Sequence, residues 1–194
     1  PLSFVATANA IAHLGAIPHF VDIEPKTLGL DAFALDKRLQ EIGETEKGKL
    51  INKKTGRRIS AVIAVHVYGH PANTNKIISI TNKWDLPLVE DAAEALGSWR
   101  ESSLRKVHCG LFGSIGTLSF NGNKLITTGG GGALITNCNK LAERARHLAT
   151  TAKINHPWNF DHDFIGWNDR MPNINAALGV AQIEILEKLL KRKR

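Results

Sequence analysis

Hydrophobic and polar positions follow two different periods along this chain. Between Leu30 and Ile42, apolar residues recur at helical spacing and Asp31 stands at the N-cap position, so this stretch predicts a helix. Residues Ile59–Gly69 instead form a nearly continuous β-branched and apolar run, which is typical of a strand buried on both faces of a parallel sheet. The two patterns alternate for most of the chain.

The other predicted elements follow the same alternation. Helices are predicted over Phe4–Gly15, Asn73–Asp85, Asn139–Ala152 (with an Asn cap) and Asn173–Arg194. Strands are predicted over Ile17–Ile23, Leu86–Asp91, Phe112–Phe120 and Gly132–Thr136, and a surface hairpin over Glu44–Arg58. Strands that alternate with helices indicate an α/β fold with a mostly parallel central sheet flanked by helices.

Charge distribution argues against a nucleic-acid partner. The chain has 194 residues, 43% hydrophobic and 22% charged, with a net charge of +7. Six of the 25 Lys and Arg lie in Lys47–Arg58 and five in Lys188–Arg194, and the remaining 14 are outnumbered by 18 Asp and Glu. No aromatic residues are interleaved with these basic segments, so a charged loop and a solvated helix end explain the basicity.

Compartment signals point to the cytoplasm. No apolar run approaches the roughly 20 residues that cross a bilayer, and the first ten residues have neither a basic n-region nor an initiating Met. Cys109 and Cys138 form no disulfide framework and suit a reducing compartment. We therefore expect a cytoplasmic protein that does not bind a membrane, and we expect Pro1 to lie inside a longer sequence.

Two candidate functional residues follow predicted strands, at the edge where parallel sheets gather their chemistry. Asp91 ends one strand, and Lys124 follows another and precedes four consecutive glycines, Gly129–Gly132, which indicate a tight turn or a close approach. Such a pair suits pyridoxal phosphate, because a lysine forms its Schiff base and a carboxylate keeps its pyridinium nitrogen protonated. The same residues also fit a generic α/β binding domain, in which Asp91 caps a helix and Lys124 is a solvated charge.

Three segments resemble, in order, the motifs of the DegT/DnrJ/EryC1/StrS sugar aminotransferases. They are VEDAAEALGS (Val89–Ser98), SFNGNKLITTGGGGALIT (Ser119–Thr136) and GWNDRMPNINAALGVAQIEIL (Gly166–Leu186). The basic insertion resembles the branch that aminates legionaminic-acid and perosamine-type precursors. The resemblance implies a PLP-dependent transferase of fold type I. Residues 1–194 would be its large PLP-binding domain, incomplete at the N-terminus and without the C-terminal small domain.

The resemblance also implies a set of site residues. These are Lys124 as the Schiff-base lysine, Asp91 as the partner of the pyridine nitrogen, Glu94 near the ring and its O3′, Ser119 as a phosphate ligand, Phe4 stacked on the ring, and Asn168 reaching the phosphate of the neighbouring subunit. Asp169 stands where the family commonly has Tyr, so the packing or substrate contact that the Tyr makes in the family is not implied for this chain. No metal is expected, because the His and Asp residues of 156–163 match no established metal spacing. His66 is interpreted as a satisfied core or cleft residue.

The implied activity is PLP-dependent amination of a keto group on a nucleotide-linked, 4-keto-6-deoxy sugar. An amino acid such as glutamate would be the donor, and the complete enzyme would be a homodimer, whereas the 194 residues alone are expected to be inactive. One alternative is a PLP-dependent sugar dehydratase of the same fold, which Lys124 disfavours because those relatives carry histidine there. The other alternative is a non-catalytic α/β binding fragment.

Overall fold

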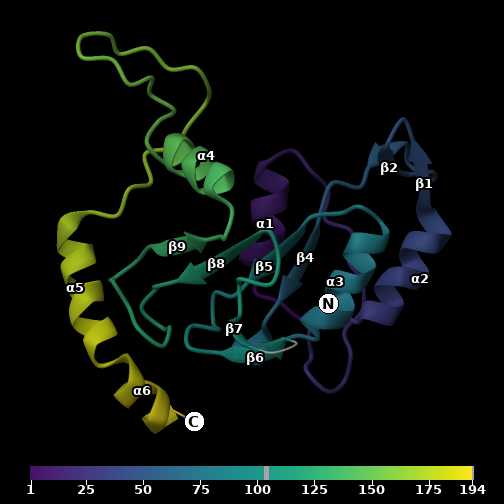
Figure 1. Cartoon of the computed structure of the whole chain (residues 1–194), viewed down its shortest axis with the longest axis horizontal. Coiled ribbons are helices and arrows are strands. Elements are labelled where there is room, and N and C mark those ends of the chain that lie inside the picture. Colours follow the sequence, from purple (N-terminus) through teal and green to yellow (C-terminus); the bar gives the residue numbers. More distant parts are fainter. Residues whose placement is uncertain (103–104, 194) are drawn as a thin grey trace.

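A four-stranded sheet lies at the centre of the computed structural model, which describes residues 1–102 and 105–193 (Figure 1). Its strand order is β4-β5-β8-β9. The bounds are β4 (Val62–Val65), β5 (Leu88–Asp91), β8 (Ile115–Ser119) and β9 (Gly132–Ile135). The first three strands run parallel, as predicted, but β9 runs antiparallel to β8 because the intervening segment returns the chain directly alongside it. The α/β fold class is confirmed, with a mixed sheet.

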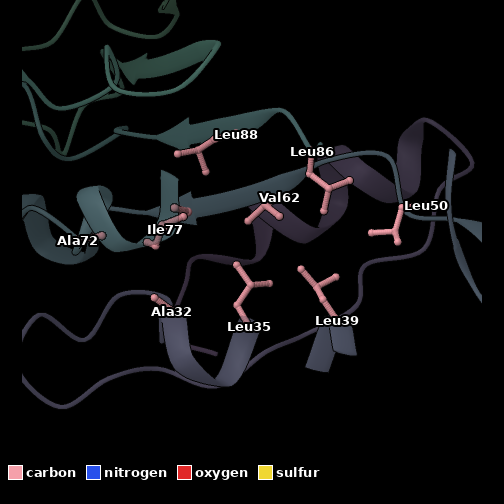
Figure 2. Packing of buried hydrophobic residues seen from close by; sticks show 10 residues of the cluster. Ala32, Leu35, Leu39, Leu50, Val62, Ala72, Ile77, Leu86 and Leu88 are labelled. Carbon is pink, nitrogen blue, oxygen red and sulfur yellow. The ribbon is translucent and has the colours of Figure 1, made fainter. Parts of the chain in front are cut away.

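The main core lies where two helices cover β4 and β5. The helices are α2 (Ala32–Ile42) and α3 (Thr74–Lys83). As predicted, Asp31 caps α2, because its carboxylate accepts from the N–H groups of Phe33 and Ala34. Leu35 and Leu39 of α2 meet Val62, Ile77 and Leu88 in this core (Figure 2). Full burial of such side chains contributes about 1.5–3 kcal/mol each.

The remaining helices lie outside this core. They are α1 (Val5–His13), α4 (Asn139–Ala149), α5 (Asn173–Glu184) and α6 (Leu186–Lys193). The single helix predicted over Asn173–Arg194 is wrong in one respect, because Ile185 leaves the helical region at φ −107° and ψ 10° and separates α5 from α6. The predicted Asn cap of α4 is also wrong, since Cys138 is the N-cap residue and Asn139 is already helical. None of the described helices combines the length and the apolar content needed to cross a membrane.

Two strand predictions need correction. Ile17–Ile23 is not a strand, because only Ile23 finds a partner, in an isolated bridge with Leu30. The strand predicted over Ile59–Gly69 is shorter and ends in a 3-10 turn, η1 (Val67–Gly69). A strand without a neighbour cannot form a ladder, however suitable its sequence.

Two small antiparallel sheets complete the described structure. The hairpin predicted over Glu44–Arg58 is confirmed as β1 (Gly43–Glu46) and β2 (Lys49–Asn52), and a third strand, β3 (Arg57–Arg58), pairs with β2. The second small sheet was not predicted; it pairs β6 (Trp99–Ser102) with β7 (Arg105–His108). Figure 1 shows β1 and β2 beyond α2, and α5 and α6 on the opposite side of the molecule, beyond β9.

Candidate active site

Four of the six predicted site residues lie at, or shortly after, the carboxyl ends of two neighbouring strands. Asp91 ends β5 and Ser119 ends β8, and the parallel register pairs Asp91 with Thr117, two residues before Ser119. Glu94 follows β5 in a turn, and Lys124 lies in the turn after β8. The sheet therefore brings these four residues to one edge, where α/β proteins bind their ligands.

Lys124 and Glu94 are in direct contact at this edge. Lys124 Nζ lies 3.2 Å from Glu94 Oε1, and the lysine side chain is only 16% exposed. Glu94 Oε2 accepts a hydrogen bond of 3.0 Å from the backbone N–H of Tyr68 in η1. One carboxylate oxygen of Glu94 is thus anchored to the turn after β4, and the other is left to orient the amine of Lys124.

Asp91 is held by two donors that carry no charge. Its Oδ2 accepts from Thr7 Oγ1 at 2.6 Å, and its Oδ1 accepts from Ala93 N at 3.1 Å. Because turns rather than a helix follow β5, the interpretation of Asp91 as a helix N-cap is wrong. None of the ion pairs formed by residues 1–102 and 105–193 includes Asp91. Its half-buried charge is therefore available to a cationic ligand atom.

Glu90, the residue before Asp91, forms a buried polar group beneath the same edge. Its Oε2 lies 2.8 Å from His66 Nε2, and neither side chain is exposed. His66 Nδ1 accepts from the N–H of Ala72, so the ring proton is on Nε2 and points to Glu90. The prediction that His66 is a satisfied buried residue is confirmed.

Backbone donors complete the surroundings of the Glu90 carboxylate. Gly110 N lies 2.9 Å from Oε2, and the N–H groups of Phe112 and Gly113 each lie 2.6 Å from Oε1. Burial by itself raises the pKa of Glu90, but the hydrogen bonds from His66 and from Gly113 and Gly110 outweigh it and hold that pKa below its ordinary value. Glu90 therefore ties the loop before β8 to β5.

The glycine run performs both tasks that its sequence indicated. Gly129 and Gly131 have φ of +78° and +102°, values that residues with a side chain rarely adopt. Gly132 begins β9, and a Cβ there would clash with the carbonyl oxygen of Leu118 in β8. The run is thus a tight turn followed by a close approach of two strands, and it closes the segment that carries Lys124.

Phe4 and Asn168, the other two predicted site residues, do not lie on the loops that follow β5 and β8. Phe4 is the N-cap residue of α1, is 77% exposed, and accepts a backbone hydrogen bond from Thr7, the donor to Asp91. Asn168 forms an isolated β-bridge with Thr150 after α4. In the part of the chain that the structure describes, no hydrogen bond joins Asn168 to the other five predicted residues.

Sequence reasoning missed three residues of this site. Glu90 carried a usable signal, because an acid inside an apolar strand requires buried partners. Tyr68 carried a weaker signal: the glycine that follows it, Gly69, indicates a turn, and Tyr68 itself adopts φ +53° in that turn. Thr7 carried no local signal, since its acceptor Asp91 lies 84 residues away.

The donor set suits pyridoxal phosphate. A lysine amine with little solvent exposure and a fixed carboxylate without a cationic partner lie at one sheet edge, and these are the two groups that the cofactor's aldehyde and ring nitrogen require. Across residues 1–102 and 105–193, no three His, Cys, Asp or Glu side chains gather to hold a metal ion. The lysine amine and the carboxylate together favour a cofactor that is held by a Schiff base.

Comparisons with known proteins agree with this chemistry. A family model described as "DegT/DnrJ/EryC1/StrS aminotransferase family" matches residues 1–194. EpsN of Bacillus subtilis, whose name assigns it provisionally to the pyridoxal phosphate-dependent aminotransferases, is 40% identical over 192 residues, covering 99% of this chain and 46% of EpsN. A GDP-perosamine synthase of Escherichia coli O157:H7 is 37% identical over 193 residues, covering 100% of this chain and 47% of that protein.

Solved structures give the same result. A DegT DnrJ EryC1 StrS aminotransferase from Brucella abortus matches with a TM-score of 0.83 and 31% identity, over 96% of this chain and 46% of that one. Helicobacter pylori PseC, an aminotransferase of pseudoaminic acid biosynthesis, matches with a TM-score of 0.78 and 30% identity, over 96% of this chain and 45% of the PseC chain. The chain spans about half the length of the proteins that it matches.

Proposed function

Because this chain belongs to the DegT/DnrJ/EryC1/StrS aminotransferase family, we propose that it forms the large domain of a PLP-dependent sugar aminotransferase. The family, the fold class and the pyridoxal phosphate cofactor predicted from the sequence motifs are confirmed by the comparisons. The substrate we propose is a nucleotide-linked 4-keto-6-deoxy sugar, with an amino acid such as glutamate as donor. The GDP-perosamine synthases among the relatives support a nucleotide-linked sugar.

One observation carries the proposal: Lys124 contacts Glu94 at the carboxyl edge of the parallel strands at which β5 ends in Asp91. The Nζ–Oε1 distance of 3.2 Å places the amine beside a carboxylate that can orient it, and Asp91 stands at the end of the neighbouring strand with its own donors in place. Lysine at this position also weighs against the dehydratase alternative. A non-catalytic fragment would have no need of a matched amine and carboxylate.

Each residue takes a distinct task in this proposal. When bound, pyridoxal phosphate supplies an electron sink for the carbon that loses a proton. Lys124 would hold the cofactor covalently through Nζ and, once released, move a proton as general base and acid, while Glu94 orients its amine. Asp91 would face the ring nitrogen and favour its charged form. Ser119 would bind the phosphate, and Phe4 would stack on the ring.

We further propose that residues 1–194 act within a longer homodimeric enzyme. Several large apolar side chains support this proposal because they are exposed: Trp158 82%, Phe160 75%, Ile165 83%, Ile174 81% and Ile183 57%. The first three belong to the segment between α4 and α5, which extends away from the sheet in Figure 1 and also carries Asn168. A partner subunit that covers this segment would receive Asn168 at its cofactor phosphate, and α5 would be covered by the rest of the enzyme.

The test uses the full-length enzyme that contains this chain. Borohydride reduction should trap pyridoxal phosphate on Lys124, and Lys124→Ala should abolish both the trapped adduct and the amination of a GDP-linked 4-keto-6-deoxy hexose with glutamate. Lys140→Ala, on the exposed start of α4, is the matched control and should behave as the wild type. An adduct on another lysine, or undiminished turnover in Lys124→Ala, would overturn the proposal.

A further inference from the structure

Thr7 makes a hydrogen bond that no local pattern explains. Its Oγ1 lies 2.6 Å from Asp91 Oδ2, and because an ionised carboxylate can only accept, Thr7 is the donor. Ser3 Oγ lies 2.7 Å from Thr7 Oγ1 and 3.1 Å from the carbonyl oxygen of Phe4, so these two oxygens compete for the single proton of Ser3. The bond from Thr7 to the carboxylate is therefore the one whose direction is fixed.

Little burial accompanies the position of Thr7, which is itself half-buried. The helix α1 that contains it has no buried residue, and the apolar Val5 and Phe4 are 59% and 77% exposed. Of the hydrogen bonds formed within residues 1–102 and 105–193, the one from Thr7 to Asp91 is the one that joins α1 to the central sheet. The hydroxyl is therefore the hydrogen-bonding link between the start of α1 and the end of β5.

The same bond orients Asp91. Thr7 occupies Oδ2 and the N–H of Ala93 occupies Oδ1, so the two donors together fix the plane of the carboxylate. The backbone N–H of Thr7 also donates to the carbonyl of Phe4 at 3.2 Å. Thr7 thus connects the residue proposed to face the ring nitrogen with the residue proposed to stack on the ring.

We propose that Thr7 is a positioning residue of the cofactor site, which holds the Asp91 carboxylate toward the pyridine nitrogen and sets α1, with Phe4, beside the ring. This inference rests on the proposed function, because it needs pyridoxal phosphate at this sheet edge. Loss of the hydroxyl leaves the carboxylate with one donor and free to rotate, and it releases α1 from the sheet. The cofactor then loses an aligned charge partner and a ring contact.

The experiment compares Thr7→Val and Thr7→Ala with Thr7→Ser in the full-length holoenzyme. The first two remove the hydroxyl, and neither removes core packing because α1 has no buried side chain. Equilibrium titration should show PLP binding weakened about tenfold in both, the loss that corresponds to one charge-assisted hydrogen bond, with a shifted near-visible absorption maximum. Thr7→Ser should restore both quantities, and Asn9→Ala, exposed on the same helix, should leave them unchanged.

Two outcomes would overturn the inference, and they are distinguishable from failure of the proposed function. Thr7→Val and Thr7→Ala with wild-type PLP affinity and spectrum would show that the hydroxyl has no such task. Failure of Thr7→Ser to restore binding in a protein that unfolds at the wild-type temperature would show that the methyl group, not the hydroxyl, matters. If Lys124→Ala loses the trapped adduct while the Thr7 variants are normal, the proposed function stands and only the role of Thr7 falls.

Discussion

Glu90 and His66 meet 2.8 Å apart at the end of two neighbouring strands, with both side chains wholly buried. Glu90 receives three backbone donors in addition to the imidazole, so each of its oxygens accepts two hydrogen bonds. Asp91, the next residue along β5, points its carboxylate the other way, toward Thr7 and Ala93. The strand therefore has a structural carboxylate on one face and the proposed cofactor carboxylate on the other.

Glu90→Gln should destabilise the fold strongly. One oxygen becomes an NH₂ donor that faces groups which are themselves donors, and the buried charge that they solvate is lost. We expect the free energy of unfolding to fall by about 3 kcal/mol, measured by urea denaturation. Glu143→Gln, exposed on α4, is the matched control and should change it by less than about 0.5 kcal/mol. Equal stability of the two variants would contradict this account of Glu90.

Acid should destabilise the wild type through the same residue. The pKa of Glu90 is held below its ordinary value of 4.5 in the folded state, so the unfolded chain binds a proton first as the pH falls. The stability due to Glu90 is fully present above about pH 4.5 and is lost as the pH falls through the lowered folded pKa. Urea midpoints measured from pH 6 downward should therefore fall less steeply in Glu90→Gln than in the wild type. Parallel curves would exclude Glu90 as the titrating group.

A pair of glycines tests the close approach of β8 and β9. Gly132→Ala places a methyl group against the carbonyl oxygen of Leu118 and should cost about 2 kcal/mol of stability. Gly122→Ala has open space around the new methyl group and should be nearly neutral. Thermal unfolding of the two variants side by side is the measurement. A neutral Gly132→Ala would mean that the strands can separate at little cost.

Glu94 should matter through its contact with Lys124. Glu94→Ala leaves the amine without its oriented acceptor and should slow covalent PLP incorporation about tenfold, whereas Glu94→Gln retains an acceptor oxygen and should slow it about threefold or less. Stopped-flow absorbance after PLP addition to the apo-enzyme gives these rates. Glu187→Ala on α6 controls for loss of a carboxylate elsewhere. Wild-type incorporation in Glu94→Ala would refute the orienting role.

Asp91→Asn should separate cofactor binding from turnover. The carboxamide keeps the shape of the side chain and one acceptor oxygen for Thr7, but it cannot stabilise a protonated ring nitrogen. We expect measurable PLP binding with turnover reduced about 100-fold or more. Asp161→Asn in the exposed segment after α4 is the control. Near-normal turnover in Asp91→Asn would leave Asp91 with a structural role in its turn only.

Local sequence determined the features whose partners lie within a few residues. Asp31 caps α2 through N–H groups two and three residues ahead, and the glycine run turns where its sequence indicated, because these contacts need no distant neighbour. The alternation of apolar periods likewise sufficed for the α/β class. The spacing of Asp91 and Lys124 after predicted strands was compatible with pyridoxal phosphate, since parallel strands end at one edge, but the resemblance of three motifs to the aminotransferase family was needed to choose that cofactor over a generic binding domain.

Only the tertiary structure decided which distant groups meet. Ile17–Ile23 has a strand-like sequence but lacks a neighbouring strand, and β9 reverses direction although its sequence resembles that of the other strands. Thr7 reaches Asp91 across 84 residues, and Lys124 reaches Glu94 across 30. Hydrogen bonds of this kind depend on the path of the whole chain, which no short window of sequence contains. The sequence around a donor does not identify a distant acceptor, and the two groups interact only when folding brings them within about 3 Å.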